Sequence, residues 1–88
     1  MVLRELEIKN KLGLHARAAA KFVRCAAGFK STVTVARGDM KVDGKSIMGV
    51  LLLAAPRGTR LEVVVDGTDE DAAMDALAVL VDDKFGEE

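Results

Sequence analysis

Apolar side chains recur along the chain with two different periods, and the period changes where the secondary structure is expected to change. Alternation at every second residue predicts strands, because successive side chains of a strand point to opposite faces. Recurrence at three and four residues predicts helices, whose buried face repeats about every 3.6 residues. Together the two patterns predict the order βαββαβα, with strands over 2–8, 31–36, 40–43 and 59–66, and with helices over 16–27, over 47–53 and after Thr68.

The apolar positions of these elements form the expected core. In the strands they are Leu6, Ile8, Val33, Val35, Leu61, Val63 and Val65, and in the first and last helices Ala19, Phe22, Val23, Ala26, Ala73, Ala76, Leu77, Leu80 and Val81. Gly28 is expected to end the first helix, and Ser46 is expected to cap the second. Thr68 is expected to cap the last helix, with Asp71 completing a weak capping box. Helices on one face of a mostly antiparallel sheet make a two-layer α+β domain, although periodicity does not fix the strand order.

Composition narrows the class of protein. The 88 residues are enough for one small domain, 1–88, and the net charge of -1 argues against nucleic acid as the main partner. The single Cys25 cannot form an internal disulfide, which fits a reducing compartment. The longest apolar run, 50–55, is far shorter than the roughly 20 residues of a membrane span, and no signal-peptide pattern opens the chain. We therefore expect a cytoplasmic protein without membrane insertion.

His15 stands where the N-cap of the first helix belongs, in the segment Gly13-Leu14-His15-Ala16-Arg17. Ala16, Arg17 and Ala18 are expected to present backbone N–H groups without partners inside the helix, at the positive end of its dipole. Such an end binds anions. Imidazole is a nucleophile at neutral pH, so a phosphoryl group on His15 would lie against these N–H groups and within reach of Arg17. From the residues alone, a plain surface histidine beside a solvated basic helix face remains an equal alternative.

Other chemistry finds less support in the sequence. One histidine and one distant cysteine do not make a metal-ligand set, so we expect no metal and no cofactor. Cys25 lies in the last turn of its helix, away from the favourable end of the dipole, and is expected to be a packing residue.

The helix behind Ser46 is apolar on every side. If Val50 and Leu53 face the core, then Met48, Leu51 and Leu52 are left near solvent with Ile47 at the edge. Exposed apolar groups of this size are typical of a partner surface, whereas a deeply buried helix would have the same composition. Ser46 itself has two interpretations, a structural N-cap and a phosphorylation site whose added charge would oppose docking of an acidic partner.

The two segments that contain His15 and Ser46 resemble the signature segments of HPr. They are Gly13-Leu14-His15-Ala16-Arg17 and Gly44-Lys45-Ser46-Ile47-Met48-Gly49-Val50. HPr is the histidine-containing phosphocarrier of the bacterial phosphotransferase system, and the resemblance covers the whole chain in element order, length and motif position. It implies an open-faced β-sandwich, with a four-stranded antiparallel sheet ordered 1-4-2-3 and three helices on one face.

The resemblance also implies roles for particular residues. His15 is implied as the phosphoacceptor, modified on Nδ1, and Arg17 as the residue that steadies the phosphoryl group. The donor is implied to be phosphorylated enzyme I, charged from phosphoenolpyruvate, and the acceptor an enzyme IIA domain. Ser46 resembles the regulatory site of an HPr kinase/phosphorylase. The implied docking residues are Ala20, Lys21, Arg24, Ile47, Met48, Leu51 and Leu52. A phosphoryl carrier of this kind is not an enzyme, and we expect a monomer.

One position departs from the family pattern. The family commonly has proline directly after the arginine, where this chain has Ala18. Alanine restores a backbone N–H and loses the stiffness that proline gives the first helical turn, so we expect slightly altered phosphate geometry and retained function. The alanine-rich helix and the acidic Glu87-Glu88 tail also resemble the nitrogen-related branch of the family, NPr.

Two other classes of function stay open at this point. The chain can be primarily a regulatory binding protein that is switched by phosphorylation at Ser46. An RNA-binding module shares the βαββαβ pattern, but such modules stack bases on aromatic side chains, and this chain has three phenylalanines and neither tryptophan nor tyrosine.

Overall fold

A computed structural model describes residues 1–87 of the chain, and its elements follow the predicted order. The strands are β1 (Val2–Glu7), β2 (Thr32–Arg37), β3 (Met40–Asp43) and β4 (Arg60–Asp66), and the helices are α1 (Ala16–Ala27), α2 (Ile47–Leu52) and α3 (Glu70–Asp82). A short 3-10 turn, η1 (Lys84–Gly86), follows α3. The boundaries lie within one residue of the predicted ones wherever both ends were predicted.

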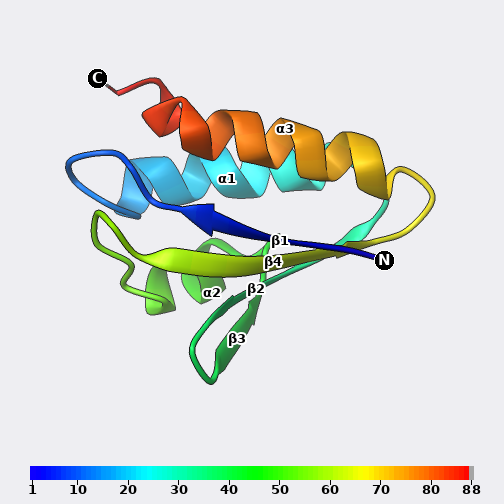
Figure 1. The fold of residues 1–88 in the computed structure, drawn as a ribbon, viewed down its shortest axis with the longest axis horizontal. Coiled ribbons are helices and arrows are strands. Elements are labelled where there is room, and N and C mark those ends of the chain that lie inside the picture. The colour runs from blue at the N-terminus through cyan, green and yellow to red at the C-terminus, as the bar shows by residue number, and fades with distance from the viewer. Residues whose placement is uncertain (88) are drawn as a thin grey trace.

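The four strands form one antiparallel sheet in the order β1-β4-β2-β3. β4 pairs with β1 on one side and with β2 on the other, and β3 pairs with β2 as a hairpin. In Figure 1, α1 and α3 lie alongside one another over one face of the sheet. α2 is shorter and packs beside α1. This is the open-faced β-sandwich expected from the resemblance.

The core lies between the sheet and the helices, and its members follow the predicted alternation. All seven predicted strand positions are buried, namely Leu6, Ile8, Val33, Val35, Leu61, Val63 and Val65. Three predicted helix positions were wrong as fully buried residues, because Val23, Ala76 and Leu80 are only half-buried. Ala18 of α1 and Met74 of α3 are buried although they were not predicted to be. The buried faces of both helices are therefore rotated about the helix axis relative to the predicted ones.

The start of α3 differs from the predicted cap. The N-cap residue is Asp69 rather than Thr68, and its side chain makes no capping hydrogen bond. Its carboxylate accepts hydrogen bonds from the backbone N–H groups of Lys30 and Ser31 at 2.8 and 2.9 Å, and from Ser31 Oγ at 2.5 Å. The predicted capping box of Thr68 and Asp71 was therefore wrong. Instead, the Asp69 carboxylate connects the start of α3 to the segment that leads into β2.

The chain turns sharply after α3. Lys84, Phe85 and Gly86 all have left-handed backbone conformations, with φ of 56°, 55° and 71°. Phe85 is 1% exposed and joins the core. Lys21 Nζ, on α1, donates a hydrogen bond of 2.6 Å to the carbonyl oxygen of Phe85. The turn consequently ends with Glu87 directed back over the N-terminal end of α1.

Candidate functional site

The segment that leads into α1 is fastened at Gly13. Its φ of +70° lies in the left-handed region that favours glycine. A Cβ at this position would lie 2.7 Å from the carbonyl oxygen of Ala55 and 2.9 Å from Pro56 Cα. The next residue, Leu14, is buried and donates its N–H to the Ala55 oxygen at 2.8 Å. The close approach of two backbones therefore fixes the position from which His15 begins α1.

His15 is the N-cap of α1, as predicted, and it caps the helix with its own ring. Its backbone is extended (φ -80°, ψ -180°), and Nδ1 accepts a hydrogen bond from the Arg17 N–H at 3.3 Å. The imidazole thus performs the role that Ser, Thr, Asp or Asn usually performs at this position. Because Nδ1 accepts this hydrogen bond, its lone pair points toward the N-terminal end of α1. The side chain of His15 is 25% exposed, so a partner can reach it.

The other ring nitrogen contacts an acidic side chain from the far end of the chain. His15 Nε2 lies 2.5 Å from Glu87 Oε2. Burial of Glu87 raises the pKa of its carboxyl, but the hydrogen bonds from Asn10 and His15 outweigh burial, and the net effect is a lowered pKa. An ionised carboxylate accepts hydrogen bonds only, so Nε2 is the donor in this pair. These contacts assign His15 the neutral tautomer with the proton on Nε2.

Asn10 also belongs to the site, although the sequence did not indicate a role for it. It is completely buried, and its amide nitrogen donates to the carbonyl oxygen of Gly13 at 2.6 Å and to Glu87 Oε1 at 3.0 Å. Its Oδ1 has no hydrogen-bond partner among the described residues. The amide therefore links the loop before His15 to the carboxylate that contacts the ring. Its burial could not be predicted from the sequence, because periodicity does not reveal burial in a loop.

Of the three backbone N–H groups predicted at the start of α1, two have no hydrogen-bond partner among the described residues. The Arg17 N–H has no partner inside α1, as predicted, but the His15 side chain outside the helix accepts its hydrogen bond at Nδ1. The N–H groups of Ala16 and Ala18 have no partner among residues 1–87. Ala18 is also fully buried, so its side chain packs in the core while its N–H adds a donor that proline would lack. The Arg17 side chain is exposed, and its positive charge contributes to lowering the pKa of Glu87.

α2 presents the apolar surface expected from its composition. Val50 and Leu53 are buried as predicted, whereas Ile47, Met48 and Leu52 are exposed, Met48 by 70%. Leu51 is only half-buried and packs against the core. Ser46 caps the helix as predicted, because its Oγ accepts the N–H of Gly49 at 3.1 Å. Since α2 packs beside α1, this apolar surface and the exposed basic side chain of Arg24 belong to adjacent helices.

Lys21 makes an internal contact that the sequence did not predict. It shares the basic face of α1 with Arg17 and Arg24, but its ammonium group is bonded to the Phe85 carbonyl and is only half-exposed. Ala20, the remaining predicted docking residue of α1, is also half-exposed.

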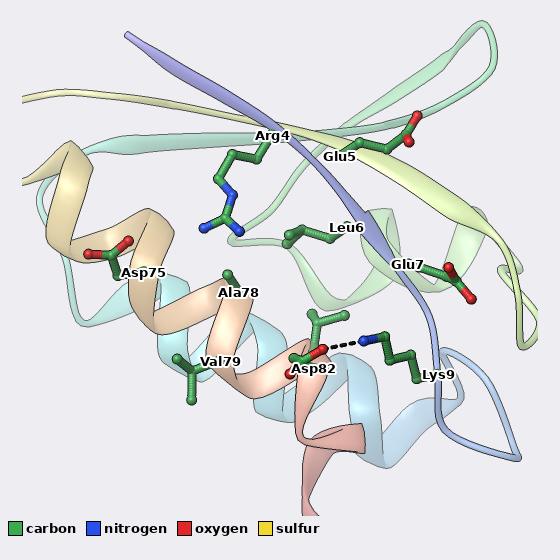
Figure 2. Close-up of a pocket in the computed structure, with 10 residues that line it drawn as sticks. Arg4, Glu5, Leu6, Glu7, Lys9, Asp75, Ala78, Val79 and Asp82 are labelled. Atoms are coloured by element: carbon green, nitrogen blue, oxygen red, sulfur yellow. Dashed lines mark hydrogen bonds and ion pairs between the residues drawn. The ribbon is translucent and has the colours of Figure 1, made fainter.

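A charged groove lies between β1 and α3, and Figure 2 shows its lining. Arg4 and Leu6 of β1 point toward α3 in this view, whereas Glu5 and Glu7 point away, as expected for alternating strand positions. Lys9 forms an ion pair with Asp82 across one end of the groove. None of the residues that line it contacts His15 or Glu87 in the described hydrogen bonds, so the groove is separate from the His15 cluster.

Cys25, a metal centre and a membrane span were the alternatives that the sequence argued against. Burial raises the pKa of the Cys25 thiol, so less of it is in the reactive thiolate form. Within residues 1–87, no three side chains of the His, Cys, Asp and Glu types gather in a way that could hold a metal ion. No helix in this part of the chain is long and apolar enough to cross a membrane.

Comparison with known proteins connects this geometry to a family. The family described as "PTS HPr component phosphorylation site" matches residues 2–83. The chain belongs to the HPr family. A curated relative, phosphocarrier protein HPr of Neisseria meningitidis, is 53% identical over 87 residues, which cover 99% of this chain and 98% of the relative. The HPr family comprises the phosphocarrier proteins of the phosphotransferase system, as the resemblance had implied.

Solved HPr structures share the fold closely. The crystal structure of HPr-C-His from Thermoanaerobacter tengcongensis superposes with a TM-score of 0.96 at 45% identity, covering 100% of this chain and 99% of the other. An HPr dimer from the same organism gives a TM-score of 0.80 at 46% identity, covering 93% and 94% of the two chains. The likeness confirms the HPr fold, and the second structure leaves the expected monomer as a prediction.

Proposed function

We propose that His15 is the phosphoacceptor and that residues 1–88 act as one cytoplasmic, monomeric phosphocarrier domain. In this proposal His15 takes a phosphoryl group on Nδ1 from phosphorylated enzyme I, which is charged from phosphoenolpyruvate, and passes it to an enzyme IIA domain. The observation that carries the proposal is the orientation of the ring. Nδ1 has its lone pair toward the N-terminal end of α1, where a bound anion is stabilised.

The surrounding groups suit a phosphoryl group in transit. The N–H groups of Ala16 and Ala18 are available as donors, and the Arg17 N–H becomes available once Nδ1 bonds to phosphorus. The Arg17 guanidinium can add charge-assisted hydrogen bonds to phosphate oxygens. A carrier must also release its cargo, and His15 at the surface needs no closed pocket for this. Transfer in both directions then depends on a docked partner that excludes water.

The test is labelling with phosphoenolpyruvate and enzyme I. The wild-type chain is expected to become phosphorylated, with the acid-labile and base-stable bond of a phosphohistidine, and to lose the label to an enzyme IIA domain. His15→Ala is expected to remain unlabelled. Equal labelling of His15→Ala would refute the assignment. Arg17→Ala, with the nucleophile intact, is expected to be labelled more slowly.

The exposed apolar face of α2 favours a second proposal, which concerns docking and its regulation. Partners would dock on Ala20, Lys21, Arg24, Ile47, Met48, Leu51 and Leu52, and phosphorylation of Ser46 by an HPr kinase/phosphorylase would weaken docking. Ser46 is partly exposed and caps α2 directly beside Ile47 and Met48. A phosphate at this helix N-terminus is stabilised locally, yet it places about two negative charges next to the apolar surface.

Incubation with ATP and an HPr kinase is expected to give an acid-stable phosphate on Ser46. The modified chain is then expected to accept a phosphoryl group from enzyme I more slowly, through a raised KM. Ser46→Ala is the matched control, and label that persists in this variant would place the modification elsewhere. A chain that functions primarily as a regulatory binding protein, as in the NPr alternative, would be switched at Ser46 even when His15→Ala removes phosphoryl transfer.

A further inference from the structure

The end of the described chain is built to return to His15. α3 stops at Asp82, and three consecutive left-handed residues reverse the chain at Lys84–Gly86. Two of these residues, Lys84 and Phe85, are not glycine, so their left-handed conformations are strained. The conformation is maintained by the buried ring of Phe85 and by the hydrogen bond from Lys21 Nζ to the Phe85 carbonyl. Backbone strain of this kind persists only where the surrounding structure fixes it.

Glu87 follows this turn, and both oxygens of its carboxylate are hydrogen-bonded. Oε2 of Glu87 contacts His15 Nε2 at 2.5 Å, and Oε1 accepts from Asn10 Nδ2 at 3.0 Å. Asn10 is itself immobilised, because it is completely buried and its amide nitrogen also binds the Gly13 carbonyl. The Glu87 side chain is only 12% exposed. The carboxylate is therefore oriented from behind, and it meets the ring on the side opposite to Nδ1.

We propose that Glu87, oriented by Asn10, is a positioning residue for phosphoryl transfer at His15: it keeps the proton on Nε2, so that the lone pair of Nδ1 faces the donor, and its charge stabilises the imidazolium that forms. The inference rests on the proposed function of His15. A carboxylate on the far nitrogen of a histidine fixes its tautomer and ring orientation and increases the basicity of the near nitrogen.

The chemical step balances without any proton transfer. The Nδ1 lone pair forms the bond to phosphorus, while the bond from phosphorus to the donor breaks and its electron pair stays on the donor. His15 keeps its Nε2 proton and becomes a phosphorylated imidazolium, whose positive charge lies next to the Glu87 carboxylate. On transfer to the acceptor, the bond from Nδ1 to phosphorus breaks, its electron pair returns to Nδ1, and the ring becomes neutral again. Glu87 thus acts in both directions and touches neither the phosphorus nor the leaving atom.

The first experiment reads the tautomer directly, in the absence of any transfer partner. Nitrogen-15 and proton NMR of the unphosphorylated chain are expected to show Nδ1 as the unprotonated nitrogen and a downfield, slowly exchanging Nε2 proton. In Glu87→Ala this proton is expected to exchange with water and lose its downfield signal. Asp39→Asn, at an exposed turn residue, is the matched single-charge control and is expected to leave the spectrum of His15 unchanged.

The second experiment measures phosphoryl transfer from phosphorylated enzyme I. Glu87→Gln retains the shape of the side chain and removes its charge, and it is expected to lower kcat roughly three- to tenfold with little change in KM, the loss of one partly exposed charge-assisted contact. Asp39→Asn is expected to match the wild type. A tail that only supports the fold would lower the stability of the Glu87 variants without changing kcat per folded molecule, and that result would overturn the inference.

A double-variant cycle tests the role of Asn10. If Asn10 acts through Glu87, then Asn10→Ala slows transfer in the wild-type background but not in the Glu87→Ala background. Equal slowing in both backgrounds would contradict the link. Failure of the wild-type chain to accept phosphate would refute the proposed function, whereas normal transfer in Glu87→Gln and Glu87→Ala would refute this inference alone.

Discussion

At the scale of single residues, the site depends on two nitrogen atoms of one ring being used differently. Nδ1 of His15 caps α1, and Nε2 binds Glu87. Neither contact requires an unusual residue, and both depend on where the backbone holds His15. The residue that sets this backbone position is Gly13, whose left-handed conformation and contact with the segment after α2 exclude any side chain.

Gly13→Ala is expected to destabilise the fold by about 3 kcal/mol, because it combines a left-handed conformation with a Cβ that meets backbone atoms. Gly38→Ala is a matched control: Gly38 also has a positive φ, of 58°, but nothing lies within 4 Å of its Cβ position. That variant is expected to lose only about 1 kcal/mol, the conformational part. Chemical denaturation of both variants checks the difference, and equal losses would mean that the Ala55–Pro56 contact relaxes freely.

At the scale of elements, side chains near helix ends connect parts that are distant in sequence. Ser46 caps its own helix, but Asp69 does not, and its carboxylate binds the N–H groups that lead into β2. Hydrogen bonds from Ser31 and Lys30 lower the pKa of Asp69 from 3.8 to about 2. The interaction therefore belongs to the ionised form, and its stabilising effect depends on pH.

Asp69→Asn is expected to destabilise the protein most near neutral pH. A carboxyl whose pKa is lower in the folded state stabilises the folded protein at pH values above the pKa that it has in the unfolded state. For Asp69 this stabilisation is lost as the pH falls from about 4 toward 2. The difference in unfolding free energy between wild type and variant should shrink over that window, as measured by urea denaturation at several pH values. Asp71→Asn, an exposed carboxylate on the same helix, is the control. A difference that is constant from pH 6 to 2 would contradict this account.

At the scale of the whole molecule, the core and the site are joined through the turn after α3. Phe85 belongs to the same core cluster as the valines of the sheet, and two residues later Glu87 contacts His15. Anchoring of the tail therefore depends on core packing as well as on the hydrogen bonds at the site.

Phe85→Leu is expected to lower the unfolding free energy by about 1–2 kcal/mol and to weaken the downfield Nε2 proton signal of His15. Val81→Ala, also a buried residue near the end of the chain, should cost a similar free energy while leaving the ring of Phe85 in place. NMR spectra of both variants, recorded under conditions where each is fully folded, separate the two effects. An unchanged His15 signal in Phe85→Leu would show that the tail is held without the aromatic ring.

The sequence alone determined whatever depends on neighbours along the chain. Strand alternation, helix repeats, the Ser46 cap and the position of His15 at the start of α1 all follow from local periodicity and local hydrogen bonding. Periodicity could not fix the strand order, which entered through the family resemblance. Val23, Ala76 and Leu80 were predicted as fully buried and are not, because a helix pattern does not specify how far each face rotates toward its neighbours.

Only the tertiary structure decided which distant residues meet. His15 and Glu87 are separated by 72 positions, and Asn10 and Glu87 by 77, so no repeat or spacing along the chain pairs them. Glu87 stood out in the sequence only as part of an acidic tail, whose last residue lies outside the described structure. It reaches the ring because Phe85 packs into the core and three left-handed residues reverse the chain. Local chemistry thus placed the histidine at a helix end, and long-range packing supplied the carboxylate that orients it.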